Sequence, residues 1–322
     1  VARPHLEERK KRYMKSKNRT YKIILLTLGA LIASGLSGCS NSDETAQDKL
    51  QIVSNFYPVK YLVDAIGGDL VTNTSLTPDG AEPHDLTLDP KALASINSAD
   101  AIFFIGASFQ PDVDKAVENL PSEVTAIDLS RSPGVVILDA PSDLGKESLA
   151  GGKDPHIWLD PKNMSAMAAD IAKTLKLLDP NSVDIFEQNL VSLVDKLDSL
   201  NKDFSAGLAS CEQKTLVTSH AAFQYLAATY GLNQLAITGI SPEDQPDAKL
   251  LAEIATEAKR VGVKTVFFED VLPKELSETV ARAIGAKTSL LSALEFTPEG
   301  SNDYISMMRD NLKNLQIGLS CR

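Results

Sequence analysis

The sequence predicts an α/β protein with two similar α/β lobes joined by one long helix. Two observations carry this prediction. Strand-like and helix-like segments alternate over residues 50–180 and again over 211–322, which is typical of parallel sheets covered on both faces. One amphipathic stretch, residues 181–210, interrupts the alternation. At 322 residues the chain is long enough to bury two cores.

The first predicted lobe contains four strands and four helices. We expect the strands at 51–54, 71–76, 101–106 and 124–128, and the helices at 58–66, 90–97, 113–120 and 163–178. Pro58 would occupy the first turn of its helix, where a missing N–H costs nothing. In open parallel sheets ligands bind outside the carboxyl ends of the strands, and His84 follows the second strand.

A single long helix is predicted between the lobes. Its apolar residues recur at steps of three and four: Phe186, Leu190, Leu193, Leu197, Leu200, Phe204 and Leu208. Pro180 and Asn181 provide a start signal, and the helix would be about 45 Å long at ~1.5 Å per residue. Because no other predicted helix matches this length, a rigid connecting rod is favoured over a coiled coil.

The second predicted lobe repeats the pattern of the first. Strands are expected at 215–218, 235–237, 264–268 and 287–291, and helices at 221–230, 247–261, 273–284 and 302–316. Gly231 and Gly262 stand where two of these helices should end.

The first 49 residues are predicted to be an export signal and a tether. Basic residues precede an apolar run over 23–36, too short for the ~20 residues that span a bilayer. Met14 begins a conventional signal, so residues 1–13 are interpreted as an over-called start. Leu36-Ser-Gly-Cys39 resembles a bacterial lipobox, which predicts cleavage of residues 1–38, lipidation of Cys39 and a polar tether over 39–49. The alternative is an ordinary signal peptide with an incidental cysteine.

The charge of the exported part argues against nucleic acid as a partner. Residues 1–38 hold nine of the 32 basic and two of the 43 acidic residues, which leaves 23 and 41, a net charge of −18. Phosphate binding requires a basic surface. This balance suits a domain whose ligand is a cation or a neutral molecule.

Histidine is rare in this chain and recurs in one context. Of the four histidines, His5 lies in the leader, whereas His84, His156 and His220 each follow a strand-like run and precede a helix-like one. His156 stands between two prolines in a stiff loop. Neutral imidazole is the commonest metal ligand. Three imidazoles 72 and 64 residues apart can meet only if both lobes face one cleft, so we expect one metal ion between the lobes.

Four segments resemble successive motifs of one family: Pro78-Asp-Gly-Ala-Glu-Pro-His84, Asp154-Pro-His-Ile-Trp-Leu-Asp-Pro161, Ser219-His-Ala-Ala-Phe223 and Gly239-Ile-Ser-Pro-Glu243. The chain resembles the zinc/manganese solute-binding lipoproteins of bacterial ABC importers, the TroA-like or ZnuA-like cluster A-I receptors, over nearly all of residues 50–322. The resemblance implies two lobes on a helical backbone, a metal in the cleft and an ABC permease as partner. Two features depart from the family: Ala221 replaces an aspartate, and 139–153 holds no histidine.

A carboxylate is expected to complete the metal site. The family's fourth ligand falls at Glu295, in the loop after the last strand, and Glu269 and Asp270 are the alternatives. Three nitrogens and one oxygen favour Zn²⁺ over Mn²⁺, which prefers more oxygen ligands. Asp160 is expected either to accept a hydrogen bond from a ligand imidazole or to cap the following helix. Trp158 and Phe223 are expected to pack beside the site.

Cys211 and Cys321 flank the second lobe. In an oxidising compartment they are expected to form a disulfide, and the alternative is two free thiols.

The function predicted from these features is capture of Zn²⁺, one ion per chain, by a monomeric lipid-anchored extracytoplasmic protein that delivers it to the permease without catalysis. The alternatives are a manganese or iron receptor of the same type and a secreted zinc hydrolase with water as fourth ligand. The sequence contains no His-Glu-x-x-His motif and no nucleophile elbow, and either motif would have favoured the hydrolase.

Overall fold

The computed structural model describes residues 49–141, 152–243, 246–269, 274–298 and 300–322. The predicted signal, Met14, Cys39 and nearly all of the tether lie outside these residues, as does Asp270. Among the helices in the described ranges, none combines the length and apolarity needed to cross a membrane.

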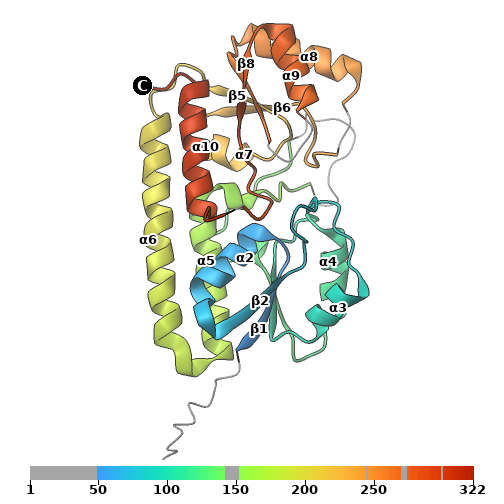
Figure 1. The fold of residues 1–322 in the computed structure, drawn as a ribbon, viewed down its shortest axis with the longest axis vertical. Coiled ribbons are helices and arrows are strands. Elements are labelled where there is room, and N and C mark those ends of the chain that lie inside the picture. Colours follow the sequence, from blue (N-terminus) through green and yellow to red (C-terminus); the bar gives the residue numbers. More distant parts are fainter. Residues whose placement is uncertain (1–48, 142–151, 244–245, 270–273, 299) are drawn as a thin grey trace, which may run out of the picture. The chain divides into compact units, whose positions relative to one another are not determined.

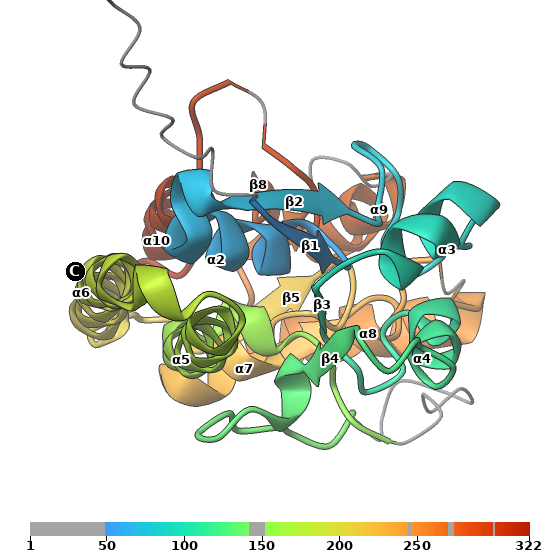
Figure 2. The same cartoon turned by 90° about the horizontal axis from the view of Figure 1, so that it is seen from below.

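Four parallel strands form the first sheet, in the order β2-β1-β3-β4. Their bounds are β1 Leu50–Ser54, β2 Val71–Ser75, β3 Ala101–Phe104 and β4 Thr125–Asp128. Parallel strands need crossover connections, and helices provide them: α2 (Tyr57–Gly67), α3 (Pro90–Asn97) and α4 (Pro111–Val117). Figure 2 shows α2 on one side of this sheet and α3 and α4 on the other.

A parallel sheet with the equivalent strand order forms the second lobe. The order is β6-β5-β7-β8, with β5 Thr215–Thr218, β6 Asn233–Ala236, β7 Thr265–Phe268 and β8 Lys287–Leu290. Its helices are α7 (Gln224–Thr229), α8 (Ala248–Arg260), α9 (Glu275–Ile284) and α10 (Tyr304–Gly318). The described residues therefore form two parallel-sheet α/β lobes, as predicted.

One long helix, α6 (Val183–Leu208), runs beside both lobes (Figure 1). Its fully buried residues are six of the seven predicted ones, Phe186, Leu193, Leu197, Leu200, Phe204 and Leu208, whereas Leu190 is only partly buried. The helix is not a free-standing rod. It packs against α5 (Pro161–Leu178), α10 and α2, because an apolar stripe of this length must be covered.

The predicted elements all occur, and the differences lie at their ends. The helix expected over 221–230 begins only at Gln224, because residues 221–223 form a turn directly after His220. The strand expected over 101–106 ends at Phe104, and the strand expected from Leu235 begins at Asn233. The helix expected over 113–120 begins two residues earlier, with Pro111 in its first turn, and ends at Val117.

The largest buried apolar cluster includes residues of both lobes. It contains Ile52 and Phe103 from the first sheet, Leu200 from α6, and Leu216 and Phe267 from the second sheet. Each lobe also has a smaller cluster, which lies under α3 and α4 in the first lobe and under α8 and α9 in the second. Residues 49–322 form one compact unit. A shared core gives the loops between the lobes a common, packed support.

Candidate metal centre

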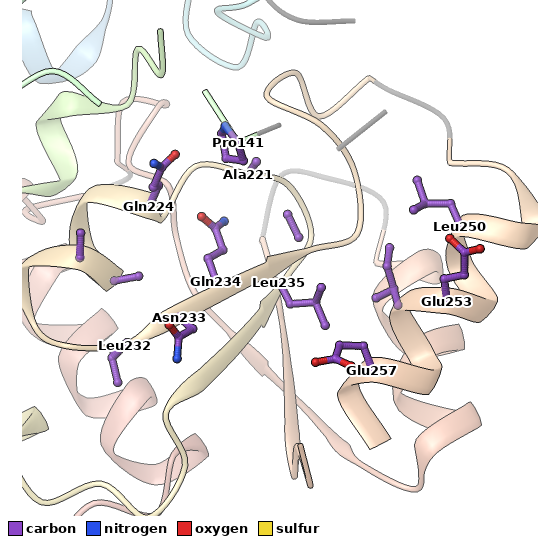
Figure 3. Close-up of a pocket in the computed structure, with 14 residues that line it drawn as sticks. Pro141, Ala221, Gln224, Leu232, Asn233, Gln234, Leu235, Leu250, Glu253 and Glu257 are labelled. Carbon is purple, nitrogen blue, oxygen red and sulfur yellow. The ribbon is translucent and has the colours of Figure 1, made fainter. Parts of the chain in front are cut away.

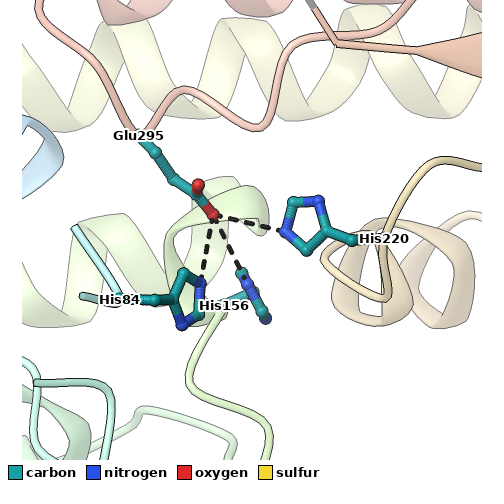
Figure 4. Close-up of side chains that lie close together, drawn as sticks. All are labelled: His84, His156, His220 and Glu295. Atoms are coloured by element: carbon teal, nitrogen blue, oxygen red, sulfur yellow. Dashed lines mark ion pairs between the residues drawn. The ribbon is translucent and has the colours of Figure 1, made fainter. Parts of the chain in front are cut away.

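Four side chains from four separate loops, two in each half of the chain, lie close together (Figure 4). His84 follows β2, and His156 begins the short 3₁₀ helix η3 (Ile157–Leu159) that leads into α5. His220 lies two residues beyond the end of β5, and Glu295 lies in the loop after β8. The carboxyl ends of parallel strands share one edge of a sheet, which explains the positions of the loops after β2, β5 and β8, whereas the His156 loop leads into α5 and follows no strand directly.

The distances among these groups suit one small cation. One nitrogen of each histidine and one oxygen of Glu295 all lie within 4.8 Å of one another. Glu295 Oε1 is 3.7 Å from Nε2 of His84 and 3.5 Å from Nε2 of both His156 and His220. Ligands of a tetrahedral zinc ion lie about 2.0–2.2 Å from the metal, so opposing donors are separated by somewhat more than 3 Å.

These donor atoms are buried and lack hydrogen-bond partners within the described part of the chain. The exposed fraction of the side chain is 4 % for His84, 0 % for His156 and His220, and 1 % for Glu295. All three Nε2 atoms and both oxygens of Glu295 are without a hydrogen bond there. A buried polar atom without a partner is costly, and a cation bound among the three nitrogens and the carboxylate would supply the missing partner.

The His156 loop carries its own carboxylate. Asp154 Oδ1 lies 2.7 Å from Nδ1 of His156 and also accepts the His156 backbone N–H at 3.0 Å. This contact places the imidazole proton on Nδ1 and leaves Nε2 free to bind a cation. Asp154 is fully buried. This role of Asp154 was not predicted from the sequence, although its position two residues before His156 was the available signal.

Glu269 holds the imidazole of His220 in the same way. Its Oε1 is 2.7 Å from Nδ1 of His220, and the same atom accepts a hydrogen bond from the Ser219 hydroxyl. Glu269, considered as an alternative ligand from sequence, therefore faces the far side of the imidazole. The His220 carbonyl in turn accepts hydrogen bonds from Thr218 Oγ1 at 2.8 Å and Gln234 Nε2 at 3.0 Å.

Polar contacts fix the His84 loop to the first sheet. Gln110 Nε2 donates to the carbonyl of Pro83 and to Thr77 Oγ1, both at 2.9 Å. The His84 backbone N–H donates to Glu82 Oε1 at 3.1 Å. Burial, and after it the charge of Glu295, raises the pKa of Glu82 to about 7. A second carboxylate, not recognised from sequence, thus lies close to the four donors.

The backbone next to Glu295 is strained. Leu294 has φ of 59°, a left-handed conformation that side chains other than glycine rarely adopt, and its side chain is fully buried. Contacts on the preceding residues hold it there. The Asn311 side chain bonds both the N–H and the carbonyl of Ser292, at 2.9 and 2.7 Å, and Ser292 Oγ accepts from Leu294 N.

The electrostatics of the cluster favour a positive charge at its centre. Burial opposes the charge of His220, but the neighbouring Glu269 and Glu295 outweigh it and raise its pKa well above the ordinary value. His156 shows the same balance, with Asp154 as the main partner, so its pKa is also raised. Burial lowers the pKa of His84. Burial also opposes the charge of Glu295, but the three neighbouring imidazoles outweigh it and hold its pKa well below the usual range.

Asp160 has the second of its two expected roles. Its carboxylate caps α5 by accepting the Lys162 N–H at 2.8 Å, and its other oxygen accepts from Thr229 Oγ1 at 2.8 Å. The other expectation, that Asp160 accepts a hydrogen bond from a ligand imidazole, is wrong. Asp154 and Glu269 occupy the Nδ1 sides of His156 and His220 instead.

Cys211 and Cys321 form a disulfide. The two residues also pair as an antiparallel bridge, next to a hydrogen bond from Gln213 N to Leu319 O at 3.0 Å. The bond joins the segment before β5 to the segment after α10.

The position where the family usually has aspartate is apolar in both sequence and surroundings. Ala221 is fully buried and packs in a small cluster with Ala236 and Ile240. It also borders a separate hollow of about 620 Å³ beside β6, between α7 and α8 (Figure 3). Gln224 and Gln234 line that hollow, which includes none of the three histidines and not Glu295. Ala221 thus takes no part in the donor set.

The fold and the donor set define a class: two-lobed α/β binding proteins with a buried cation site between the lobes. Within that class, the chain belongs to the family described as "Zinc-uptake complex component A periplasmic" (ZnuA), which it matches over residues 52–318. This is a family of substrate-binding proteins.

Two curated relatives and one solved structure illustrate the similarity. The zinc-binding lipoprotein AdcA of Streptococcus pneumoniae strain R6 is 35% identical over 304 residues, 92% of this chain and 60% of AdcA. The high-affinity zinc uptake system protein ZnuA of Bacillus subtilis strain 168 is 31% identical over 297 residues, 89% of this chain and 93% of that protein. The Zn(II)-bound ZnuA-like domain of S. pneumoniae AdcA superposes with a TM-score of 0.72 at 33% identity, covering 84% of this chain and 99% of the domain.

Proposed function

We propose that this protein captures Zn²⁺ outside the cytoplasm and delivers it to an ABC importer, without catalysing a reaction. The observation that carries the proposal is the convergence of four buried donor atoms, one from each side chain, that lie within 4.8 Å of one another and have no hydrogen-bond partner among the described residues. The zinc-binding relatives and the ZnuA family support the same cargo. Because the chain spans only 60% of AdcA, this support concerns the shared part.

His84, His156, His220 and Glu295 would bind the ion through their Nε2 atoms and one carboxylate oxygen. Three imidazole nitrogens with one carboxylate oxygen form a complete tetrahedral set for zinc, whereas Mn²⁺ and Mg²⁺ prefer more oxygen ligands. Asp154 and Glu269 would hold two of the imidazoles in the required tautomer. The same completeness argues against a zinc hydrolase, which keeps its fourth position open for water.

The remaining parts of the proposal concern location and partners. The lipobox-like Leu36-Ser-Gly-Cys39 supports a lipid anchor on Cys39, and two acyl chains would hold the protein at the membrane stably. We propose a monomer with one Zn²⁺ per chain, and an ABC permease as the partner that receives the ion. We also propose the domain boundaries expected from the sequence: a first lobe over 50–180, a linking helix over 181–210 and a second lobe over 211–322.

The decisive experiment is elemental analysis with competition calorimetry on the chain that begins after Cys39. We expect one Zn²⁺ per chain, preferred over Mn²⁺. A variant with His84, His156 and His220 all replaced by alanine should not bind zinc. Asp79→Asn, at an exposed position in the His84 loop, is the control and should bind normally. Zinc affinity that survives the triple replacement, or a preference for Mn²⁺, would contradict the proposal.

A further inference from the structure

The loop that carries His156 is held by side chains of the second lobe. Tyr225 Oη donates to the Asp154 carbonyl at 2.6 Å, and Tyr304 Oη donates to the Trp158 carbonyl at 2.6 Å. In the other direction, Trp158 Nε1 donates to the Ala293 carbonyl at 2.7 Å. Trp158, Tyr225 and Tyr304 are almost completely buried. The His156 loop and the second lobe are therefore joined by direct, water-excluded hydrogen bonds.

The Trp158 bond ends two residues before Glu295, at a strained part of the backbone. Leu294 lies between Ala293 and Glu295 and has the left-handed φ of 59°. A strained conformation persists only where its surroundings hold it. Asn311 holds Ser292 on one side, and the indole holds Ala293 next to it. Packing alone would not need the indole N–H of Trp158. The hydrogen bond from this N–H to the Ala293 carbonyl therefore indicates a role beyond packing.

The indole is itself fixed in position. Its ring centroid lies 4.7 Å from that of Phe56, 5.2 Å from Phe109 and 5.0 Å from the imidazole of His156. An N–H on so firmly packed a ring is a rigid reference point for whatever accepts it.

We propose that Trp158 is a positioning residue for Glu295. Through the hydrogen bond to Ala293, the indole keeps the carboxylate at the correct distance from the imidazole of His156, on the opposite lobe. The proposal rests on the cation-binding function proposed above. It assigns to the tryptophan a specific part in closing the coordination sphere: when this bond breaks, Glu295 leaves the ion first.

The test is a double-mutant cycle on zinc affinity and zinc dissociation rate. Trp158→Phe keeps an aromatic ring and removes the N–H. We expect it to weaken zinc binding about tenfold, through faster dissociation, because the Ala293 carbonyl loses its partner and the strained loop relaxes. In a Glu295→Ala background the same replacement should change affinity by less than about twofold, because the two residues act as one unit.

A spectroscopic measurement distinguishes positioning from general packing. With Co²⁺ in place of zinc, the visible absorption of Trp158→Phe should move toward that of Glu295→Ala. Thr229→Val is the matched control, because it removes another hydrogen bond between the lobes, 2.8 Å long, that does not reach the Glu295 loop. The control should leave both affinity and spectrum unchanged.

A chemical substitution covers the case in which Trp158→Phe does not fold. The chain contains one tryptophan, so a tryptophan analogue incorporated throughout replaces residue 158 alone. Benzothienylalanine has nearly the same size and carries sulfur where indole carries N–H. An unchanged zinc dissociation rate with this analogue would overturn the proposal, as would an equal tenfold loss in the Glu295→Ala background. Failure of the unmodified protein to bind zinc would contradict the proposed function instead.

Discussion

At the scale of single residues, the cation site depends on groups that do not touch the cation. A histidine offers a cation either nitrogen, and the hydrogen bond made by the other nitrogen decides which one is free. Asp154 and Glu269 bind Nδ1 of His156 and His220, which leaves Nε2 of each imidazole for the cation. These carboxylates also lower the cost of placing a positive ion among buried imidazoles, because their charges lie one ring away.

Replacing these carboxylates by amides should weaken zinc binding. For Asp154→Asn or Glu269→Gln we expect a loss of about 10–100-fold, because the amide no longer fixes the imidazole proton on Nδ1. Competition with a chromophoric chelator measures the change. Asp160→Asn is the control, since Asp160 caps α5 and should alter stability more than affinity. Equal losses of zinc affinity in all three variants would mean that Asp154 and Glu269 act only through the stability of the fold.

Zinc binding should weaken as the pH falls. The pKa values of His156 and His220 are raised in the metal-free protein, so these imidazoles take up protons at a higher pH than free histidine does. A protonated imidazole cannot bind zinc, and each proton that zinc must displace lowers the apparent affinity about tenfold per pH unit. Calorimetry in buffers of different ionisation enthalpy should detect released protons. Affinity independent of pH between about 5.5 and 8 would contradict this expectation.

At the scale of elements, the amphipathic pattern of α6 was readable from sequence, but its neighbours were not. The buried residues of α6 are those that recur at steps of three and four. The pattern indicates which face is covered, and it cannot indicate by what. The structure shows that α6 packs against α5, which directly precedes it, and against α2 and α10, which are distant in sequence. The first residues of α4 and α7 also differ from the predicted ones. Pro111 sets the start of α4, and the turn after His220 delays the start of α7.

Replacing a buried residue of α6 should destabilise the protein as a whole. Leu200→Ala removes a fully buried side chain, and we expect a loss of about 2–5 kcal/mol in the free energy of unfolding. Ile185→Ala, on the same helix but 47 % exposed, should change it by less than about 0.5 kcal/mol. Urea unfolding of the metal-free proteins measures both. A small effect of Leu200→Ala would mean that α6 contributes little to the core.

At the scale of the whole molecule, two features hold distant parts of the chain together, a shared apolar core and a disulfide. A buried apolar cluster joins residues of both sheets to α6. The disulfide between Cys211 and Cys321 joins the two ends of the second lobe across a sequence separation of 110 residues. A covalent bond over so long a loop restricts the unfolded chain strongly.

Removing this disulfide should reduce stability and leave zinc affinity nearly unchanged. In the chain-entropy treatment a loop of about 100 residues is worth about 4.7 kcal/mol, and measured losses are often smaller, about 2–5 kcal/mol. The Cys211→Ser/Cys321→Ser variant and thermal unfolding of the metal-free protein measure the loss. Thiol counting in denaturant without reductant should find no free thiol at these positions. A large fall in zinc affinity would instead place the disulfide in the binding mechanism.

Much of this protein was determined by the sequence alone. Strand–helix alternation predicted two parallel-sheet lobes, and the helical period of residues 181–210 predicted the long helix, because both signals arise from local periodicity. The three histidines stood out because the chain has so few. The expected strand precedes His84 and His220, whereas His156 follows an irregular segment after β4 and η2 (Leu129–Arg131). Only the tertiary structure decided that Asp154 and Glu269 hold the imidazoles, that Asp160 caps α5, and that the Trp158 indole reaches Ala293. The indole of Trp158 and the carbonyl of Ala293 are 135 residues apart, and no local pattern encodes a hydrogen bond between two segments that meet only when both lobes have folded.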